Sequence, residues 1–339
     1  MECEERRARI LWGQHLTDLA DQGTVCRDLN GIQAQFLPSA LHNLAARTGG
    51  AAEPGELVKS WTVRGTVHLF HLDDLPLFLY EGRDRFLRPV DRMAADQFIT
   101  LERKQYFAHL ILDELSNGPR KREALRIVCR KAGMTETEEQ SVFDGWGGTL
   151  RYLAETGQIV HGVTEDKTFQ LCPPFTPMEE GTARVEMARR YFAHFGPATV
   201  RDAAYYFGKP QRDVKKWMAE LPLEHDTADG KDCFWLDDRR RDWPQPPKCL
   251  FLAHFDQLIL GYEKTESIFL PKEHMRSIFN LAGIVMPVIL LQGRVAGSWK
   301  QKNGKLTLTA FEKWNARDKK AIQEAAEKLW TVTKVTWEQ

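Results

Sequence analysis

The chain has 339 residues, of which 42% are hydrophobic, and its formal net charge is zero. This apolar content excludes an intrinsically disordered protein, and the length predicts two or more domains or a compact array of small modules. A net charge of zero does not favour nucleic-acid binding, because backbone phosphates attract Lys and Arg. The distribution of charge along the chain is therefore more informative than its sum.

The cysteines and the apolar segments indicate the cellular setting. No two of the six cysteines have the CxxC spacing of a zinc knuckle or a redox pair. Residues 1–9 are densely charged, with no apolar segment of a secretory signal, and the longest apolar run, 281–291, is too short to span a bilayer. We therefore expect reduced thiols and a soluble, cytoplasmic protein with no membrane partner.

Residues 1–104 are predicted to form a first module of three helices and a hairpin. The predicted helices lie at 6–20, 24–31 and 39–48, and the predicted strands at 57–64 and 66–71. Residues 73–104 are predicted to be helical and to lead into the next module.

Residues 105–178 repeat this order as a second module. An apolar helical stripe is broken by an Asn-Gly-Pro sequence, and a second predicted helix ends at Gly133. Thr135 and Glu138 have the spacing of a capping box, which predicts the start of a longer third helix. Residues 159–171 are predicted to form a hairpin.

Residues 179–247 show the same order as a third module. A Gly-Pro pair ends the first predicted helix, and Thr199 and Asp202 start the second with capping-box spacing. After a third helix, Asp229-Gly230 between two strand-like runs predicts a hairpin. The repeated order predicts tandem winged helix-turn-helix modules.

Residues 248–339 have a different pattern. Short β-rich runs punctuated by glycine predict a small barrel or curled sheet, followed by a helix near 315–329 and a last short strand. The predicted fold class is therefore α+β, with three tandem winged helix-turn-helix modules followed by a small C-terminal β-barrel.

Basic residues concentrate in two segments, 103–131 and 184–216, which each hold eight Lys or Arg against three acids. A single run of this kind is commonly a solvated helical face. Two runs at matching places in modules of a DNA-binding type favour a surface that contacts phosphates. The residues predicted to bind DNA there are Arg120, Lys121, Arg201 and Lys215.

A loop is predicted at residues 30–38, between the second and third helices of the first module. Gln33 and Gln35 are two residues apart, so in an extended segment their side chains lie on one side. Each amide offers a carbonyl acceptor and an NH2 donor, so two amides can hold one water from two directions. The pair alone does not distinguish a site from an ordinary polar loop.

Five segments in chain order resemble the AlkZ/YcaQ family of winged-helix DNA glycosylases, over residues from about 10 to 310. Ser60–Leu69 resembles the family's Trp…Arg-Gly-Thr-(apolar)-His-Leu signature, and Gly293–Trp299 resembles its Gly-Arg-Val-x-Gly-x-Trp turn. The other three segments are Leu29–Gln35 with Ala45-Ala46-Arg47 after it, Phe195–Thr199, and Phe251–Gly261 with the family's Phe-Asp pair. One such match would be unspecific, whereas five in family order are specific.

The resemblance implies a monofunctional, hydrolytic DNA glycosylase of base excision repair. Family members remove cationic N7-alkylated purines, and some unhook interstrand crosslinks. Gln33 and Gln35 fill both places of the family's catalytic Gln-x-Gln motif, but Ala34 is smaller than the usual middle residue. We expect a monomer that binds double-stranded DNA with alkylated bases and uses no metal and no cofactor.

The lack of a carboxylate in the loop agrees with such a substrate. An N7-alkylguanine already carries a positive charge and leaves as a neutral base, so no general acid is needed. We expect Gln33 and Gln35 to orient a water towards C1′, with catalysis resting on positioning. General-base help is worth roughly 10²–10⁴-fold, so its absence would confine the enzyme to activated, cationic lesions.

Three further residues are predicted to contact DNA. Arg64 and His68 would face a DNA cleft beside the Gln loop, and Trp299 would probe the backbone or minor groove. The alternatives are a hairpin Arg, a satisfied buried His and a core Trp. His68 and His71 do not predict a metal pair, because residues three apart on a strand point to opposite faces. Asp256 is expected to be structural or close to DNA.

The alternative function is a non-catalytic winged-helix DNA-binding protein, either a regulator or an architectural binder. It would use the same basic faces and would need no Gln pair, so the formation of abasic sites in alkylated DNA would distinguish the two. A metal-dependent nuclease is disfavoured, because no Asp, Glu and His motif has metal-ligand spacing.

Overall fold

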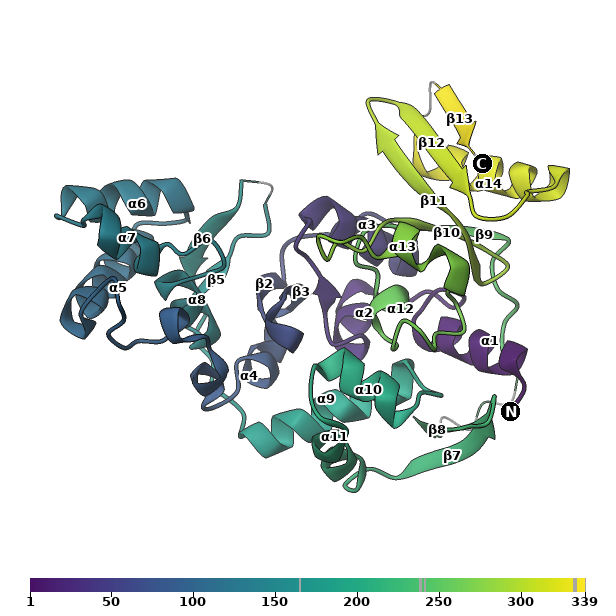
Figure 1. Ribbon diagram of the computed structural model, residues 1–339, viewed down its shortest axis with the longest axis horizontal. Helices are drawn as coiled ribbons and strands as arrows, with labels where there is room; N and C mark the ends of the chain where they lie inside the picture. The colour runs from purple at the N-terminus through teal and green to yellow at the C-terminus, as the bar shows by residue number, and fades with distance from the viewer. Residues whose placement is uncertain (165, 238–239, 241, 332–333, 339) are drawn as a thin grey trace. The chain divides into compact units, whose positions relative to one another are not determined.

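The computed structural model describes residues 1–164, 166–237, 240, 242–331 and 334–338. Its fold is mixed α+β, as predicted (Figure 1). The chain divides into two compact units, of which the first comprises residues 1–53 with 187–339 and the second residues 54–186. These units are larger than the four predicted modules, whose boundaries stay a prediction.

The first unit begins with three helices, α1 (Cys3–Gly13), α2 (Gln22–Asp28) and α3 (Leu37–Thr48). α1 ends well before the predicted end at residue 20, because the chain turns at His15, which has a left-handed φ of 57°. Asp21 caps α2 by accepting a hydrogen bond from the backbone of Thr24. Gly49 follows α3 with a φ of 74°, a conformation that favours glycine.

Three helices and a hairpin follow at residues 180–236, and the first of these helices begins in the second unit and continues into the first. They are α9 (Glu180–His194), α10 (Val200–Phe207), α11 (Gln211–Met218), β7 (Leu223–Ala228) and β8 (Lys231–Leu236). The predicted capping box of Thr199 and Asp202 is confirmed, and so is the hairpin turn at Asp229-Gly230. Tyr191 of α9 stacks on the buried ring of Phe195, directly after the helix, and contacts the buried ring of Tyr206 in α10, which joins the two helices in one core.

The C-terminal part of the first unit is a five-stranded sheet with the order β13-β12-β11-β10-β9. Its strands are β9 (Cys249–Leu252), β10 (Val288–Leu291), β11 (Arg294–Lys302), β12 (Lys305–Ala310) and β13 (Lys334–Glu338). Helices α12 (Gln257–Leu260) and α13 (Met275–Ile278) lie between β9 and β10, and α14 (Ala316–Leu329) lies between β12 and β13. The predicted C-terminal helix and last strand are thus confirmed.

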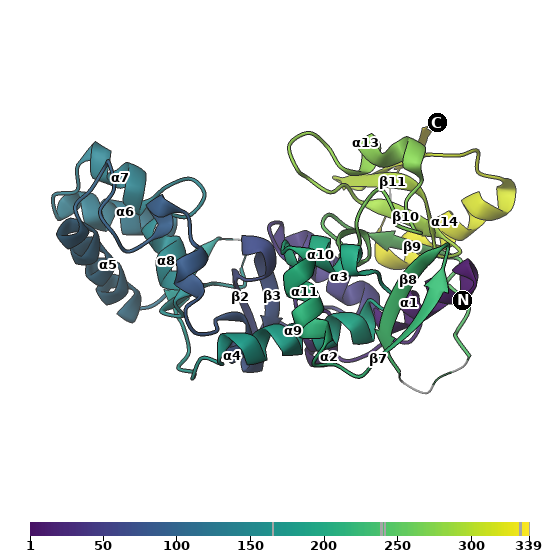
Figure 2. The same cartoon turned by 60° about the horizontal axis from the view of Figure 1, so that its bottom comes forward.

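The predicted barrel is wrong for the strands that the structure describes, because β9 and β13 are the two edge strands of the sheet and do not pair with each other. Figure 1 labels the five strands, and Figure 2 shows β9, β10 and β11 side by side. Helix α14 contributes Ile322 and Ala326 to the core that covers one face. At the β9 edge, His42 of α3 donates a hydrogen bond of 2.7 Å to the Phe251 carbonyl. An edge covered by another element needs no closing strand.

The second unit contains a sheet and a helical cluster. Its strands are β2 (Leu57–Trp61), β3 (Val67–His71), β4 (Arg120–Lys121), β5 (Ile159–His161) and β6 (Thr168–Leu171). Its longer helices are α5 (Leu101–Ser116), α6 (Arg122–Lys131), α7 (Glu136–Val142) and α8 (Thr149–Glu155). The predicted hairpin at 159–171 is confirmed.

Two predicted helices of the second unit are wrong. The third helix of the second module starts at the predicted capping box but divides into α7 and α8, because Gly147 and Gly148 have positive φ values. Trp146, which a continuous helix would place in line with Val142 and Leu150, is 77% exposed at this break. Of the predicted helix at 73–104, residues 73–100 form only short helical turns, among them α4 (Leu75–Phe78), since prolines and Gly82 interrupt the segment, and α5 begins at Leu101.

Among the described residues, no helix combines the length and the apolar content that crossing a membrane requires.

Candidate active site

The predicted Gln loop lies in the first unit, between α2 and α3. Asn30 and Gly31 both have left-handed φ values, 54° and 80°, which turn the chain sharply after α2. The short strand β1 (Ile32–Gln33) follows, and α3 begins at Leu37. The Asn30 side chain fixes the turn by donating a hydrogen bond of 3.0 Å to the carbonyl of Met187.

The two glutamine side chains of the loop contact each other. Gln33 Nε2 donates a hydrogen bond to Gln35 Oε1 at 2.7 Å, so both amides lie on one side, as predicted. Gln33 is 3% exposed, whereas Gln35 is exposed to solvent. Ala34, between them, is buried, so the loop packs with a small residue in this place. One amide of the pair is thus buried, and the other is accessible to solvent.

A buried ion pair lies in the same unit as this loop. Arg47 of α3 donates two hydrogen bonds, of 2.8 Å and 2.9 Å, to the carboxylate of Asp256, and both side chains are completely buried. Asp256 also caps α12 by accepting from the backbone of Leu258. The next residue, Gln257, donates its side-chain amide to the carbonyl of Gly31. Asp256 is therefore structural, which was one of its two predicted roles.

The segment before Asp256 packs against the start of α3. The ring of Phe36 lies edge-on to His254, with centroids 5.3 Å apart, and also contacts Phe255. Asn43 accepts from the backbone of Ala253 at 2.8 Å and donates to the carbonyl of His254 at 3.1 Å. Sequence reasoning missed Asn43 and Gln257 as supports of the loop, although Gln257 is a polar residue within an apolar run.

Arg64 and His68 lie in the second unit. Arg64 is half-buried in the turn η1 (Val63–Gly65), with a left-handed φ of 57°. His68 of β3 is fully buried, and its Nδ1 donates to the carbonyl of Thr66 at 3.1 Å. Burial, and then the charge of Arg64, lower the pKa of His68 to about 3, so its ring is neutral at physiological pH. Contact of either residue with DNA stays a prediction.

The basic residues of the second unit are largely paired with acids of that unit. Arg120 contacts Glu114 at 2.5 Å, and Lys121 contacts Asp166 at 2.7 Å. The same holds for Arg103 with Glu138, for Lys104 with Asp96, and for Arg126 and Arg130 with Glu139. This pairing weakens the phosphate attraction expected from the sequence run, because each acid offsets a positive charge.

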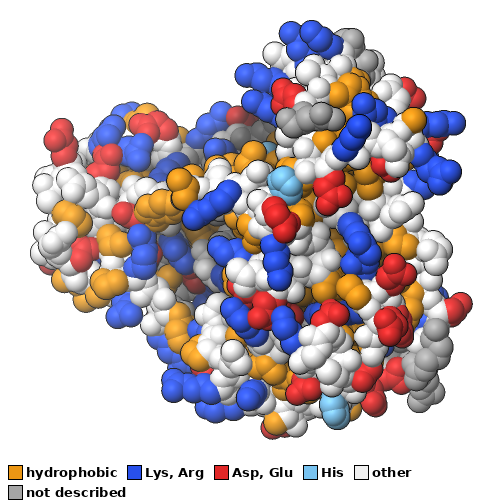
Figure 3. All heavy atoms as spheres, turned by 45° about the vertical axis from the view of Figure 1, so that its right-hand side comes forward, with side chains coloured by type: hydrophobic (Ala, Val, Ile, Leu, Met, Phe, Trp, Pro, Cys, Tyr) orange, Lys and Arg blue, Asp and Glu red, His pale blue; other side chains and the backbone are white. Residues whose placement is uncertain are grey.

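The two predicted DNA-binding residues of the first unit, Arg201 and Lys215, have different surroundings. Arg201 contacts Glu266 at 2.7 Å. Lys215 is exposed on α11, and its neighbours Arg212 and Lys216, which are 83% and 77% exposed, lie 3.8 Å and 3.9 Å from Asp213. On the face drawn in Figure 3, Lys and Arg side chains lie interspersed with Asp and Glu. DNA binding by Arg120, Lys121, Arg201 and Lys215 stays a prediction, and the geometry favours Lys215 among them.

Trp299 has a packing role in the C-terminal sheet. Its Nε1 donates a hydrogen bond of 2.9 Å to the carbonyl of Leu252, and its ring contacts Phe251, Trp330 and His42. These contacts fit the predicted core alternative, and a DNA contact of Trp299 stays a prediction.

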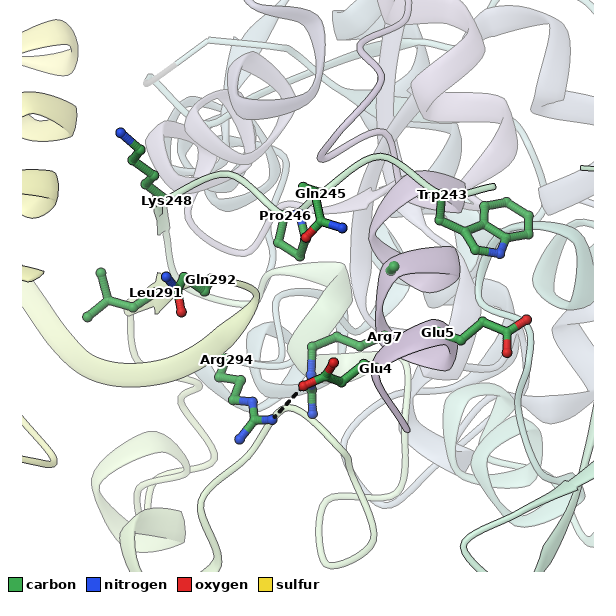
Figure 4. A pocket seen from close by; sticks show the side chains of 11 residues that line it. Glu4, Glu5, Arg7, Trp243, Gln245, Pro246, Lys248, Leu291, Gln292 and Arg294 are labelled. Carbon is green, nitrogen blue, oxygen red and sulfur yellow. Dashed lines mark ion pairs between the residues drawn. The ribbon is translucent and has the colours of Figure 1, made fainter. Parts of the chain in front are cut away.

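A charged pocket of about 640 Å³ lies elsewhere in the first unit (Figure 4). Glu4 and Arg7 of α1 line it together with Trp243, Lys248 and Arg294, and Arg294 lies 3.8 Å from Glu4. No residue of the Gln loop lines this pocket, so it is distinct from the candidate active site.

This chain is similar to known DNA glycosylases in sequence and in fold. A family model described as DNA glycosylase AlkZ-like matches residues 26–332. An interstrand DNA cross-link repair glycosylase of Streptomyces sahachiroi is 25% identical to this chain over 328 residues, which cover 88% of this chain and 87% of that protein. The solved structure of the Streptomyces sahachiroi DNA glycosylase AlkZ has a similar fold, with a TM-score of 0.79, 21% identity and 99% of each chain covered.

Proposed function

Since this chain belongs to the AlkZ-like family of DNA glycosylases, which are hydrolytic enzymes acting on DNA, we propose that its substrates are cationic N7-alkylated purines. The enzyme hydrolyses their N-glycosidic bond in double-stranded DNA, and Gln33 and Gln35 position the attacking water. The observation that carries this proposal is the direct contact of the two amides, of which one is buried and one exposed.

The amide pair suits a water that needs direction more than activation. Gln35 Oε1 has two lone pairs and uses one to accept from Gln33 Nε2. The second can accept a hydrogen from a water, which turns a lone pair of that water towards C1′. Because the alkylated base leaves neutral, no protein acid is required, and the rate gain comes from orientation. Uracil and undamaged purines are therefore poor substrates.

The proposal extends to crosslinked DNA, because a relative named as an interstrand DNA cross-link repair glycosylase is similar to this chain over most of its length. We also propose that the three segments with helices and a hairpin act as winged-helix modules on the duplex. In the third of them, α11 presents Arg212, Lys215 and Lys216 to solvent, as a helix that contacts phosphates would.

The test is release of 7-methylguanine from alkylated duplex DNA. Replacing Gln33 or Gln35 with Ala should lower the single-turnover rate by roughly 100-fold, the scale of losing one well-positioned group. The control is Gln323→Ala, since Gln323 is exposed on α14 and bonds only locally to Glu327. Thermal unfolding of each variant shows that the fold is kept.

Two outcomes would overturn the assignment. Unchanged rates in the double variant Gln33→Ala with Gln35→Ala would remove the pair from catalysis. Binding of alkylated DNA by the wild-type protein without any abasic sites would favour the non-catalytic DNA-binding alternative. A panel that adds one crosslinked duplex and one uracil duplex then tests the proposed substrate range.

A further inference from the structure

A second cluster of chemically active side chains lies in the first unit, formed by His15, Asp28 and His194. His15 Nε2 lies 2.9 Å from one carboxylate oxygen of Asp28, and His194 Nε2 lies 3.5 Å from the other. One ligand atom from each of the three residues lies within 4.8 Å of the other two. The three residues are far apart in sequence, so no spacing motif could reveal them.

We propose that His15, Asp28 and His194 bind one divalent transition-metal ion of the zinc class. Two imidazole nitrogens and one carboxylate oxygen form a ligand set that Zn²⁺ accepts. Ligand atoms about 2.0–2.1 Å from a tetrahedral zinc lie roughly 3.3 Å from one another. The separations of 2.9 Å and 3.5 Å, measured to different carboxylate oxygens of Asp28, are close to this value, and one ligand atom from each of the three residues lies within 4.8 Å of the others.

The orientation of His194 supports this assignment. Its Nδ1 donates to the carbonyl of Gly13 at 3.0 Å, which leaves the lone pair of Nε2 directed at Asp28. Metal-binding histidines are typically held by such a hydrogen bond from their second nitrogen. Gly13 permits the close approach, since a Cβ there would lie 2.8 Å from the backbone oxygen of His194.

The surrounding backbone also favours a cation. Asp28 and His194 are the last residues of α2 and α9, and His15 follows the end of α1 by two residues. The C-terminal end of a helix carries a partial negative charge of up to roughly half an electron. The side chains are 14%, 18% and 22% exposed, so an ion can enter, and a water can complete its coordination.

Such an ion would join the ends of three helices close to the start of the Gln loop, since Asp28 is followed in sequence by the turn at Asn30 and Gly31. Binding of such an ion would stabilise the first unit by holding these helix ends together. The inference does not depend on the proposed function, because it rests on side chains outside the Gln pair.

The test is zinc binding to the full chain after removal of metals with a chelator. Calorimetric titration of the wild-type protein should show one bound Zn²⁺, and Asp28→Asn or His15→Gln should weaken binding by at least about 10-fold. The control is His109→Gln, because His109 is exposed on α5 and should leave the affinity unchanged. Circular dichroism of each metal-free variant monitors folding.

A second measurement identifies the ligands and keeps the test decisive if one variant fails to fold. Co²⁺ in place of Zn²⁺ should give an absorption spectrum of nitrogen and oxygen ligands, and Zn²⁺ should raise the thermal midpoint of the wild type and of His109→Gln. No Zn²⁺ binding, unchanged affinity in His15→Gln and Asp28→Asn, or a thiolate-to-cobalt charge-transfer band would each overturn the proposal. Base excision by the same variants is assayed separately, so that the result for the metal site is distinguished from the result for Gln33 and Gln35.

Discussion

The ion pair of Arg47 and Asp256 is predicted to be a main determinant of stability in the first unit. Both side chains are completely buried, and the two hydrogen bonds between them measure 2.8 Å and 2.9 Å. Arg47 also donates to the carbonyl of Asn43 at 2.9 Å. Replacing Asp256 with Asn keeps the shape of the side chain but leaves a buried guanidinium without a counter-charge.

The expected cost of Asp256→Asn is about 3–5 kcal/mol of unfolding free energy, the scale for a buried charge that has lost its partner. Replacing both partners, as Arg47→Met with Asp256→Leu, removes the charge together with its partner and should cost much less than the sum of the single changes. Excision should fall with Asp256→Asn as well, because the adjoining Gln257 holds the carbonyl of Gly31 before the Gln loop.

The assay is urea unfolding of the full chain, monitored by circular dichroism and Trp fluorescence. It is applied to Asp256→Asn and to the double-mutant cycle of wild type, Arg47→Met, Asp256→Leu and the double variant. The matched control is Asp318→Asn, since Asp318 is part of the exposed capping box that begins α14. A loss below about 1 kcal/mol for Asp256→Asn would refute the reasoning, and so would a double variant as unstable as the sum of the single ones.

Three other predictions follow from the same geometry. Burial lowers the pKa of His161 to about 3, below an unfolded value near 6.5. The neutral ring therefore makes its full contribution to the unfolding free energy above pH 6.5. That contribution decreases as the pH falls, by about 2 kcal/mol at pH 5. Urea unfolding from pH 7 to 5 measures this decrease. The same slope of unfolding free energy against pH in His161→Phe as in the wild type would contradict the prediction. Ala34→Ile should cost about 1–3 kcal/mol through overpacking and lower excision, since Ala34 is 1% exposed; unchanged thermal unfolding and excision would contradict this. Lys215→Ala should weaken DNA binding and lower by about 1 the slope of log binding constant against log salt concentration. Arg120→Ala should have little effect, because Arg120 is paired with Glu114. Equal slopes for the two variants in fluorescence anisotropy would contradict this difference between Lys215 and Arg120.

Local signals in the sequence predicted the structure where nearby residues decide it. The capping boxes at Thr135 and Thr199 and the Asp229-Gly230 turn are found where the pattern placed them, because each depends on a few neighbouring residues. The prediction of one long third helix in the second module was wrong at Gly147 and Gly148. The helical spacing of apolar residues continues across these two glycines, whose positive φ values break the helix.

The sequence by itself determined the family and the pairing of Gln33 with Gln35, because motif order and the alternation of side chains are properties of the chain alone. Only the tertiary structure decided which charges are available and what supports the loop. A run of Lys and Arg does not show the acids that fold against it, and the partners of Arg47 and His194 are distant in sequence. Ion pairs and ligand clusters depend on distance in space, which composition and spacing do not contain.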